Sequence, residues 1–309
     1  MDLKYLDYVI TVAKEKNISR AAEKLFVSQP TLSQYIQKLE QNLGIPLFNR
    51  NNKNITLTAA GKAYIESAKK ILNINRQTDL LLSDFSACKK GLLSLGIPNT
   101  IGVIILPRIL PKFHKLYPDV SFTITERNSS ELLQLTERRQ IDIAIVQQSD
   151  KANTLIFEPL YADEFLLVVP KEHIIAQTVP PSSDCKYPKI SLSLCENEQF
   201  IILKEGFTRQ KIYNLFNKAN VFPKKIIEIR NMQTAHLMAS EGLGLTFVTE
   251  SLVKSSPEIA KTLRYYSVEE PENIWTMSLA YHKDCYMANI ILDLIKVLKE
   301  ETSIFTQVT

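Results

Sequence analysis

Hydrophobic residues in the first 60 positions recur at helical spacing, in three segments separated by short polar breaks. The first segment predicts a helix with one apolar face, formed by Leu3, Leu6, Ile10 and Ala13. The second predicts a short helix that begins at Ser19, a residue type that caps helices. Its small pair, Ala21 and Ala22, lets another helix approach closely. The pattern therefore predicts packed helices joined by tight turns.

The third segment predicts a helix capped by Ser28 or Gln29, with Pro30 in its first turn, where a missing N–H costs nothing. Its inward positions recur at four and three residues: Leu32, Ile36 and Leu39. Its outward positions carry amide, hydroxyl or cationic groups and no carboxylate: Gln29, Thr31, Ser33, Gln34, Gln37 and Lys38. Such a face can pair with base edges and phosphates. The alternative is an ordinary amphipathic helix pair, whose outer face normally mixes Glu with Lys.

The residues after this helix predict a wing, a small hairpin beside a helix-turn-helix. The stretch 43–48 predicts the end of the helix followed by a short apolar segment, and 55–58 predicts a short extended segment. Between them lies a polar, Asn-rich turn over 50–54 that carries Arg50 and Lys53. A hairpin tip of this kind is free to reach a phosphate or the minor groove.

The charge distribution supports this interpretation. The first 90 residues carry 14 lysines and arginines against 8 acidic residues, and the rest of the chain carries 23 against 25. Positive charge is thus concentrated where contact with phosphate is expected. Because the excess is modest, tight binding requires two or more copies side by side.

A long helix is predicted from Thr58, a good N-cap, to Phe85, since this stretch has no proline and only one glycine, near its start. A heptad-like seam, interrupted only by the polar Asn75 and Thr78, runs along this helix: Leu57, Tyr64, Ala68, Ile71, Asn75, Thr78, Leu82 and Phe85. The seam predicts pairing with the same helix of a second chain, and Asn75 can fix the register. The alternative is a lone amphipathic helix packed on its own domain.

Beyond residue 90 the pattern changes to apolar strands that alternate with helices. Strands at 92–97, 120–125 and 141–146, with helices between them, predict a β-α-β-α-β unit with a parallel or mixed sheet. A second unit is predicted from four strands: 165–169, 200–203, 226–229 and 245–248. The last strand, 276–281, and the helix 287–298 are expected to return to the first unit. The result is two α/β lobes joined by crossings near 159–162 and 265–268.

Polar residues follow the strands of both lobes. Open α/β sheets bind ligands at the carboxyl ends of strands, where helix N-termini offer free N–H groups. This rule selects the following candidate ligand-binding residues: Asn99, Thr100, Ser129, Gln147, Lys204, Phe207, Thr208, Asn231 and Gln233. They suit a small polar or anionic molecule. Ser, Thr and Asn at such places are also plain helix caps.

Three stretches together resemble the LysR-type transcriptional regulators, and the likeness covers the whole chain. They are AAEKLFVSQPTLSQYIQKLEQNLGIPLFNR with the following LTAAGKAY, GIPNTIGVIILPRILPKFHKLYPDVSFTITERNSSELLQLTERRQIDIAIV, and RNMQTAHLMASEGLGLTFVTES. The family usually has an arginine where this chain has Gln34, so the positive charge of the reading helix is lower here.

The resemblance implies an α/β fold with an N-terminal winged helix-turn-helix (1–58), a linker helix for dimerisation (59–88) and an effector-binding domain (89–309). The latter has two periplasmic-binding-protein-like lobes, about 91–160 with 267–300 and about 161–266. The expected partners are an interrupted inverted repeat of double-stranded DNA, a small organic anion, other copies of the chain in dimers and tetramers, and RNA polymerase. The residues expected to contact DNA are Ser19, Gln29, Pro30, Thr31, Ser33, Gln34, Gln37, Lys38, Arg50 and Lys53.

Cysteines and histidines give no sign of a metal or cofactor. Cys88, Cys185, Cys195 and Cys285 show no C-x-x-C spacing, and the four histidines are scattered. Peroxide sensors of the family carry a reactive cysteine where this chain has Thr208, which argues against that mechanism. A redox-responsive regulator using Cys185 and Cys195 remains an alternative. The segment 177–188 looks like an extension relative to the family.

Two other classes of protein are less consistent with the sequence. A solute-binding protein would explain the two lobes but not residues 1–90, and it would carry a signal peptide. An enzyme would need a nucleophile with a base, paired carboxylates or metal ligands, and the chain has no G-x-S-x-G, P-loop or G-x-G-x-x-G motif. With no stretch near the roughly 20 apolar residues of a membrane span, a cytoplasmic regulator without a cofactor is expected.

Overall fold

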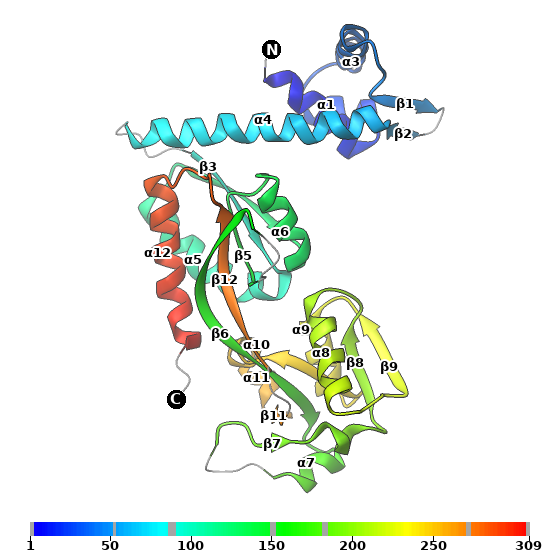
Figure 1. Cartoon of the computed structure of the whole chain (residues 1–309), viewed down its shortest axis with the longest axis vertical. Coiled ribbons are helices and arrows are strands. Elements are labelled where there is room, and N and C mark those ends of the chain that lie inside the picture. The colour runs from blue at the N-terminus through cyan, green and yellow to red at the C-terminus, as the bar shows by residue number, and fades with distance from the viewer. Residues whose placement is uncertain are drawn as a thin grey trace. The chain divides into compact units, whose positions relative to one another are not determined.

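The computed structural model describes residues 3–51, 54–85, 91–148, 153–180, 185–269 and 273–306. They form two compact units, 1–82 and 83–309, which Figure 1 colours from blue to cyan and from cyan to red.

The first unit begins with the three predicted helices: α1 (Lys4–Glu15), α2 (Ile18–Lys24) and α3 (Gln29–Leu43). Ser28 caps α3, and its hydroxyl accepts a hydrogen bond of 3.3 Å from the N–H of Thr31. The expected cap of α2 at Ser19 is wrong. Asn17 holds that position, because its side chain accepts from the N–H of Arg20 at 3.1 Å and it has the extended backbone of an N-cap.

The helices pack on a shared core. Leu32 and Ile36 of α3 are fully buried, as predicted, against Ala21 and Ala22 of α2. The buried face of α1 is rotated from the predicted one: Leu6, Val9 and Val12 are buried, whereas Ile10 and Ala13 are only partly buried. The two rings of Tyr5 and Tyr35 stack at 4.0 Å between centroids on this core.

The predicted wing is an antiparallel hairpin of β1 (Phe48–Asn51) and β2 (Asn54–Leu57). Lys53, the second predicted wing residue, is outside the described residues. The long helix α4 (Ala59–Asp84) follows, and its predicted cap is confirmed because the Thr58 hydroxyl accepts from the N–H of Gly61 at 2.9 Å. Three large apolar side chains of α4 are exposed: Ile71, Ile74 and Leu82.

The second unit opens with the predicted β-α-β-α-β pattern. Its elements are β3 (Gly91–Ile97), α5 (Asn99–Leu116), β4 (Val120–Glu126), α6 (Ser129–Glu137) and β5 (Ile143–Gln147). The strands are parallel in the order β4-β3-β5. The return of the last elements is confirmed: β12 (Ile274–His282) pairs with β5, and α12 (Asn289–Thr306) packs on α5. We call this part lobe 1.

Strand β6 (Leu155–Pro170) is longer than predicted and continues from lobe 1 into the second sheet, as Figure 1 shows. Up to Glu164 it pairs with β12, and from Phe165 it pairs with β10 (Leu245–Thr249). The first crossing between the sheets therefore lies within one strand, a few residues later than predicted. Pro159 sits beside a register shift between β6 and β12, which accommodates the missing N–H of proline within a strand.

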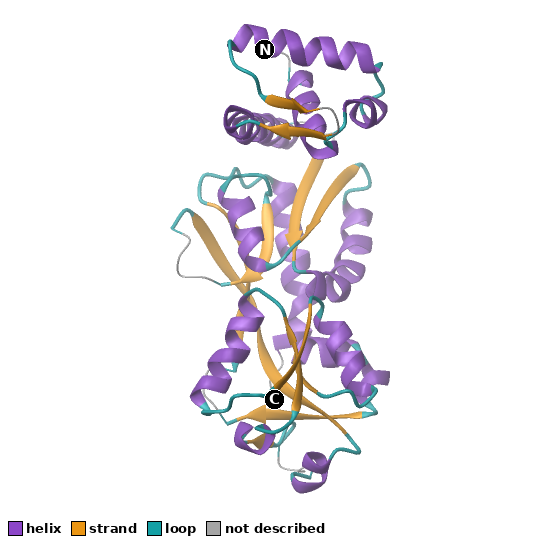
Figure 2. Cartoon of the chain, turned by 90° about the vertical axis from the view of Figure 1, so that its right-hand side faces the viewer, coloured by secondary structure: helices purple, strands orange, loops and turns teal. Residues whose placement is uncertain are grey.

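We call the second sheet and its helices lobe 2. It contains the predicted β8 (Gln199–Leu203), α8 (Phe207–Lys218), β9 (Lys225–Ile229) and α9 (Met232–Ser240). The sequence did not predict its shorter elements: α7 (Ile174–Thr178), β7 (Lys189–Ile190), the 3-10 turn η1 (Leu192–Cys195), α10 (Glu250–Ser255), α11 (Pro257–Ala260) and β11 (Leu263–Val268). Figure 2 shows helices on both faces of the strands in the second unit. No described helix is both long and apolar enough to cross a membrane.

Candidate functional site

The outward face of α3 is free of structural partners at most of the predicted positions. Gln29, Gln34, Gln37 and Lys38 are exposed, and Ser33 is half-buried. Thr31 is exposed, but its hydroxyl is hydrogen-bonded to that of Ser28 at 2.7 Å. The cap of α3 therefore engages the hydroxyl of Thr31, and the other candidate side chains remain available for contact with DNA.

The carboxylate of Glu40 points away from this face. It accepts the N–H groups of Leu47 and Phe48 at 2.8 and 3.0 Å and so secures the connection to the wing. Ser19 is exposed on α2. Arg50 belongs to β1, but its side chain, like the whole of Lys53, lies outside the described residues.

A cavity of about 330 Å³ lies between lobe 1 and lobe 2. It brings together seven of the nine residues predicted to bind a ligand: Asn99, Thr100, Ser129, Gln147, Phe207, Thr208 and Asn231. The other two, Lys204 and Gln233, do not line it. Lys204 is exposed, and Gln233 contributes its backbone N–H to the cap at Asn231.

Four helix N-termini converge on this cavity, those of α5, α6, α8 and α9. Two are closed by side chains: Asn128 accepts the N–H of Glu131 at 2.9 Å, and Asn231 accepts that of Gln233 at 2.8 Å. The N-caps of α5 and α8 are Pro98 and Gly206, and neither makes a side-chain cap bond. Their first N–H groups, which carry partial positive charge, are thus the donors that a ligand can use.

Two buried side-chain atoms of the cavity wall have no hydrogen-bond partner among the described residues: the Oε1 atom of Gln147 and the Nε1 atom of Trp275. Buried polar groups are normally paired. A molecule in the cavity that offers both a donor and an acceptor would satisfy them. Gln147 is held in place from its backbone, whose N–H reaches the Ser129 hydroxyl at 3.4 Å.

Charged residues of both signs line the cavity, and the sequence reasoning missed them. They are Glu126, Arg127, Glu131, Glu205 and Arg230. The Arg127 Nε atom lies 3.5 Å from the Glu131 carboxylate. Three of the five follow directly on β4 or β9 or close to β8, so the rule that selected Thr100 and Ser129 could have found them. The signal that could have found them was their position after the strands, because the selection favoured hydroxyl and amide side chains and, of the charged residues, took only Lys204.

The cysteines expected as a redox alternative differ in exposure. Cys185 is exposed and Cys195 is buried, and neither forms a disulfide. Within the described ranges, no three His, Cys, Asp or Glu side chains are grouped so that they could hold a metal ion.

A winged helix-turn-helix and two α/β lobes around a polar cavity define a DNA-binding regulator with a ligand-binding domain. Comparison with protein families agrees: residues 3–62 match the bacterial regulatory helix-turn-helix protein model of the lysR family, and residues 88–303 match the LysR substrate binding domain. The chain belongs to the LysR family of transcriptional regulators.

Individual relatives give the same assignment. An uncharacterised HTH-type transcriptional regulator of Bacillus subtilis, YcgK, is 31% identical over 261 residues, which is 80% of this chain and 79% of YcgK. Among solved structures, a full-length OxyR variant from Pseudomonas aeruginosa has a TM-score of 0.71 at 24% identity, covering 98% of this chain and 94% of that one. The full-length regulator CbnR in complex with its target DNA has a TM-score of 0.66 at 20% identity, covering 97% and 100% of the two chains.

Proposed function

We propose that two copies of this chain read an interrupted inverted repeat on double-stranded DNA, each through α3, and that a small organic anion in the cavity controls that reading. The cavity carries the second half of the proposal, because it joins polar groups of both lobes to two uncapped helix N-termini. A two-fold protein assembly requires a two-fold site. We place this activity in the cytoplasm, with RNA polymerase as the further partner.

The DNA contacts divide by chemistry. Ser33, Gln34 and Gln37 have side chains that can pair with base edges, whereas Lys38 and the wing residues Arg50 and Lys53 suit phosphates. The chain divides for this purpose into the winged helix-turn-helix (1–58), the linker helix (59–88) and the ligand-binding domain (89–309). The solved complex of CbnR with its target DNA supports this use of the N-terminal domain.

The cavity favours a ligand with a single anionic group. The free N–H groups of α5 and α8 provide a place for one carboxylate. Three carboxylates, those of Glu126, Glu131 and Glu205, line the cavity against two arginines, Arg127 and Arg230, and this excess disfavours a second negative charge on the ligand. Binding would shift the two lobes towards one relative orientation only to the extent that the ligand binds that orientation more tightly than the others.

Alanine at Ser33 or Gln34 is expected to weaken binding to the preferred site by about 1–3 kcal/mol and to spare binding to random DNA. Alanine at Lys38 is expected to weaken both equally and to reduce the salt slope by about one. Gel-shift titrations at several salt concentrations, on a site selected by the protein from randomised DNA, measure both effects. Equal losses on selected and random DNA for Ser33→Ala would contradict the assignment.

Valine at Thr100 is expected to abolish the stabilisation that a cavity ligand gives. A ligand that binds only the folded state stabilises it by about 2.7 kcal/mol at a hundredfold excess over Kd. The measurement is a thermal-shift screen of small carboxylates against the full chain, with Thr123→Val as the matched control. Thr123 is exposed on β4 and does not line the cavity.

The control variant Thr123→Val should keep the increase in melting temperature that each ligand gives. Thr100→Val should lower the melting temperature of the unliganded protein only a little. The proposed role of the cavity fails if valine at Thr100, Ser129 and Thr208 leaves the shifts of all stabilising carboxylates unchanged.

A further inference from the structure

Asp163 is a buried carboxylate at the junction of the two lobes. Its side chain is 2% exposed, and it lies on β6 one residue before the end of the pairing with β12. Its partner in that register is Trp275, which lines the cavity. A carboxylate in such a place loses hydration, so its remaining partners determine its behaviour.

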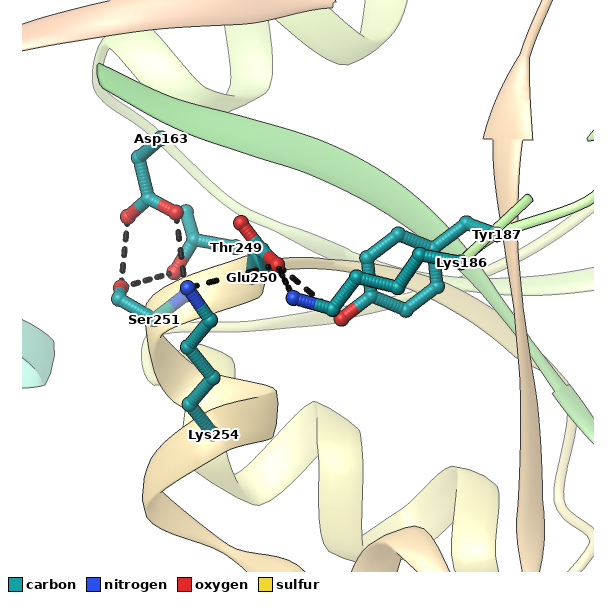
Figure 3. A network of polar contacts seen from close by, with 7 residues as sticks. All are labelled: Asp163, Lys186, Tyr187, Thr249, Glu250, Ser251 and Lys254. Carbon is teal, nitrogen blue, oxygen red and sulfur yellow. Dashed lines mark hydrogen bonds and ion pairs between the residues drawn. The ribbon is translucent and has the colours of Figure 1, made fainter. Parts of the chain in front are cut away.

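The partners of Asp163 are two hydroxyl-bearing residues at the start of α10 (Figure 3). One carboxylate oxygen accepts the N–H of Ser251 at 3.0 Å, and the other accepts the Ser251 hydroxyl at 2.6 Å. The Ser251 and Thr249 hydroxyl oxygens are 3.0 Å apart. Thr249 is the N-cap of α10 but makes no cap bond, so Asp163 serves as the cap from a neighbouring strand.

The other buried carboxylate of this network, Glu250, is compensated by cations. It forms ion pairs with Lys186 and, at 3.5 Å, with Lys254, and it accepts the Tyr187 hydroxyl at 3.4 Å. Asp163 has no ion pair among the residues in Figure 3. Burial, opposed by the hydrogen bonds from Ser251 and Thr249 and assisted by the charge of Glu250, raises the pKa of Asp163 to about 6.

One more titratable group acts within this network. The hydroxyl of Tyr161, on the same strand, is buried, and burial together with the Asp163 charge raises its pKa well above 10. It stays protonated throughout the range in which Asp163 changes its charge. The buried His236 of α9 has its pKa lowered to about 4 by burial and also stays in one state above that pH.

Thr249 connects this network to the cavity, because it belongs to the network through its hydroxyl and also lines the cavity wall. An ionised carboxylate only accepts hydrogen bonds. While Asp163 is ionised, the hydroxyls of Ser251 and Thr249 must both be oriented inward as donors. The Thr249 hydroxyl then has only lone pairs left to offer to a ligand.

We propose that Asp163 is a positioning residue that determines specificity: through Ser251 it orients the Thr249 hydroxyl, so that this point of the cavity wall accepts a hydrogen bond and selects a ligand that donates one. Proton uptake by Asp163 reverses the direction of these hydrogen bonds. The carboxyl group then donates to the Ser251 hydroxyl, Ser251 donates to Thr249, and the Thr249 hydroxyl is left to donate to a ligand. The proton comes from water and forms the O–H bond of the Asp163 carboxyl group; every other change is in the direction of a hydrogen bond. The unpartnered Oε1 atom of Gln147 is a second acceptor in the same wall. The selected class is thus a small carboxylate that also bears a hydroxyl or amine donor.

The consequence for ligands rests on the proposed function of the cavity, but the orientation can be tested without a ligand. Trp275 is the only tryptophan in the chain, and its ring packs at 5.2 Å from that of Phe165. A change of charge on the residue opposite it will alter its emission. The experiment is a fluorescence titration of the full chain between pH 4.5 and 8, which we expect to show a transition near pH 6.

Five variants test the direction of the hydrogen bonds. Asp163→Asn should abolish the transition. Thr249→Val and Ser251→Ala each remove a hydroxyl whose hydrogen bond lowers the pKa of Asp163, and each should raise the midpoint by about one pH unit. Glu250→Gln is the matched control, since it removes a neighbouring charge and should lower the midpoint. Circular dichroism at pH 7 checks that each variant is folded, and Thr249→Ser, which keeps the hydroxyl, should restore the original midpoint.

Three results would overturn the proposal. A transition that persists in Asp163→Asn belongs to another group. An unchanged midpoint in Thr249→Val means that this hydroxyl does not donate towards Asp163. A wild-type chain with no transition means that Asp163 does not change its charge in this range. None of these results bears on whether the cavity binds a ligand, so the proposed function stands or fails separately.

Discussion

Replacing Gly61 with alanine is expected to destabilise the DNA-binding unit by about 3 kcal/mol or more, at the upper end of overpacking effects. A Cβ atom at this position would lie 2.0 Å from the carbonyl oxygen of Leu47. That oxygen cannot move away cheaply, because it accepts the N–H of Thr58 at 3.0 Å and so connects the wing to α4. The contact is backbone against backbone, and no side chain can rotate to relieve it.

Differential scanning calorimetry of the full chain measures this effect. The transition of the first unit should shift to lower temperature, and that of the second should stay unchanged. Gly44→Ala is the control: Gly44 has φ +68° but nothing within 4 Å of its Cβ position, so only the backbone cost of about 1–2 kcal/mol is expected. If Gly61→Ala proves no more destabilising than Gly44→Ala, the close approach of α4 to residue 47 is not present in solution.

The elements with a strong local pattern could be predicted from the sequence. Helix α3 was defined by its spacing of Leu32 and Ile36 and by the Ser28 cap, and the strand at 143–147 by a continuous apolar run. Strand β6 was predicted too short because Glu158 and Pro159 interrupt its pattern. Its first half is held by pairing with β12, more than 100 residues away in sequence, and local reasoning cannot see such pairing.

The cavity shows the same limit. Thr100, Ser129 and Thr208 follow the ends of predicted strands, and the rule for open α/β sheets located them without coordinates. Trp275 and Thr249 line the same wall, but they belong to β12 and β10, so their presence there depends on how two sheets share β6. Ser19 illustrates a different error: two good capping residues stood two positions apart, and the backbone at Asn17 decided between them.

Glutamate at both Ile71 and Leu82 is expected to convert dimers of the N-terminal part into monomers. These residues are 40% and 57% exposed on α4 and lie on the predicted seam, about three turns apart. Ile74, on the same helix, is 54% exposed. Apolar side chains in a row on a long helix are typical of a surface that another helix covers. Two like charges on each chain would face their copies across that seam and prevent the contact.

Sedimentation velocity of a fragment 1–88, which contains the compact unit 1–82, measures the assembly. The unchanged fragment and the control Lys70→Glu, a charge reversal at an exposed position beside the seam, should sediment as dimers, and the double variant as a monomer. In the full chain, losing this pairing should weaken binding to the two-fold DNA site by about 10²–10⁴, because the second half-site no longer benefits from the first. A wild-type fragment that stays monomeric at high concentration would instead place the dimer contact in the lobes, and α4 would then need another explanation for its exposed apolar residues.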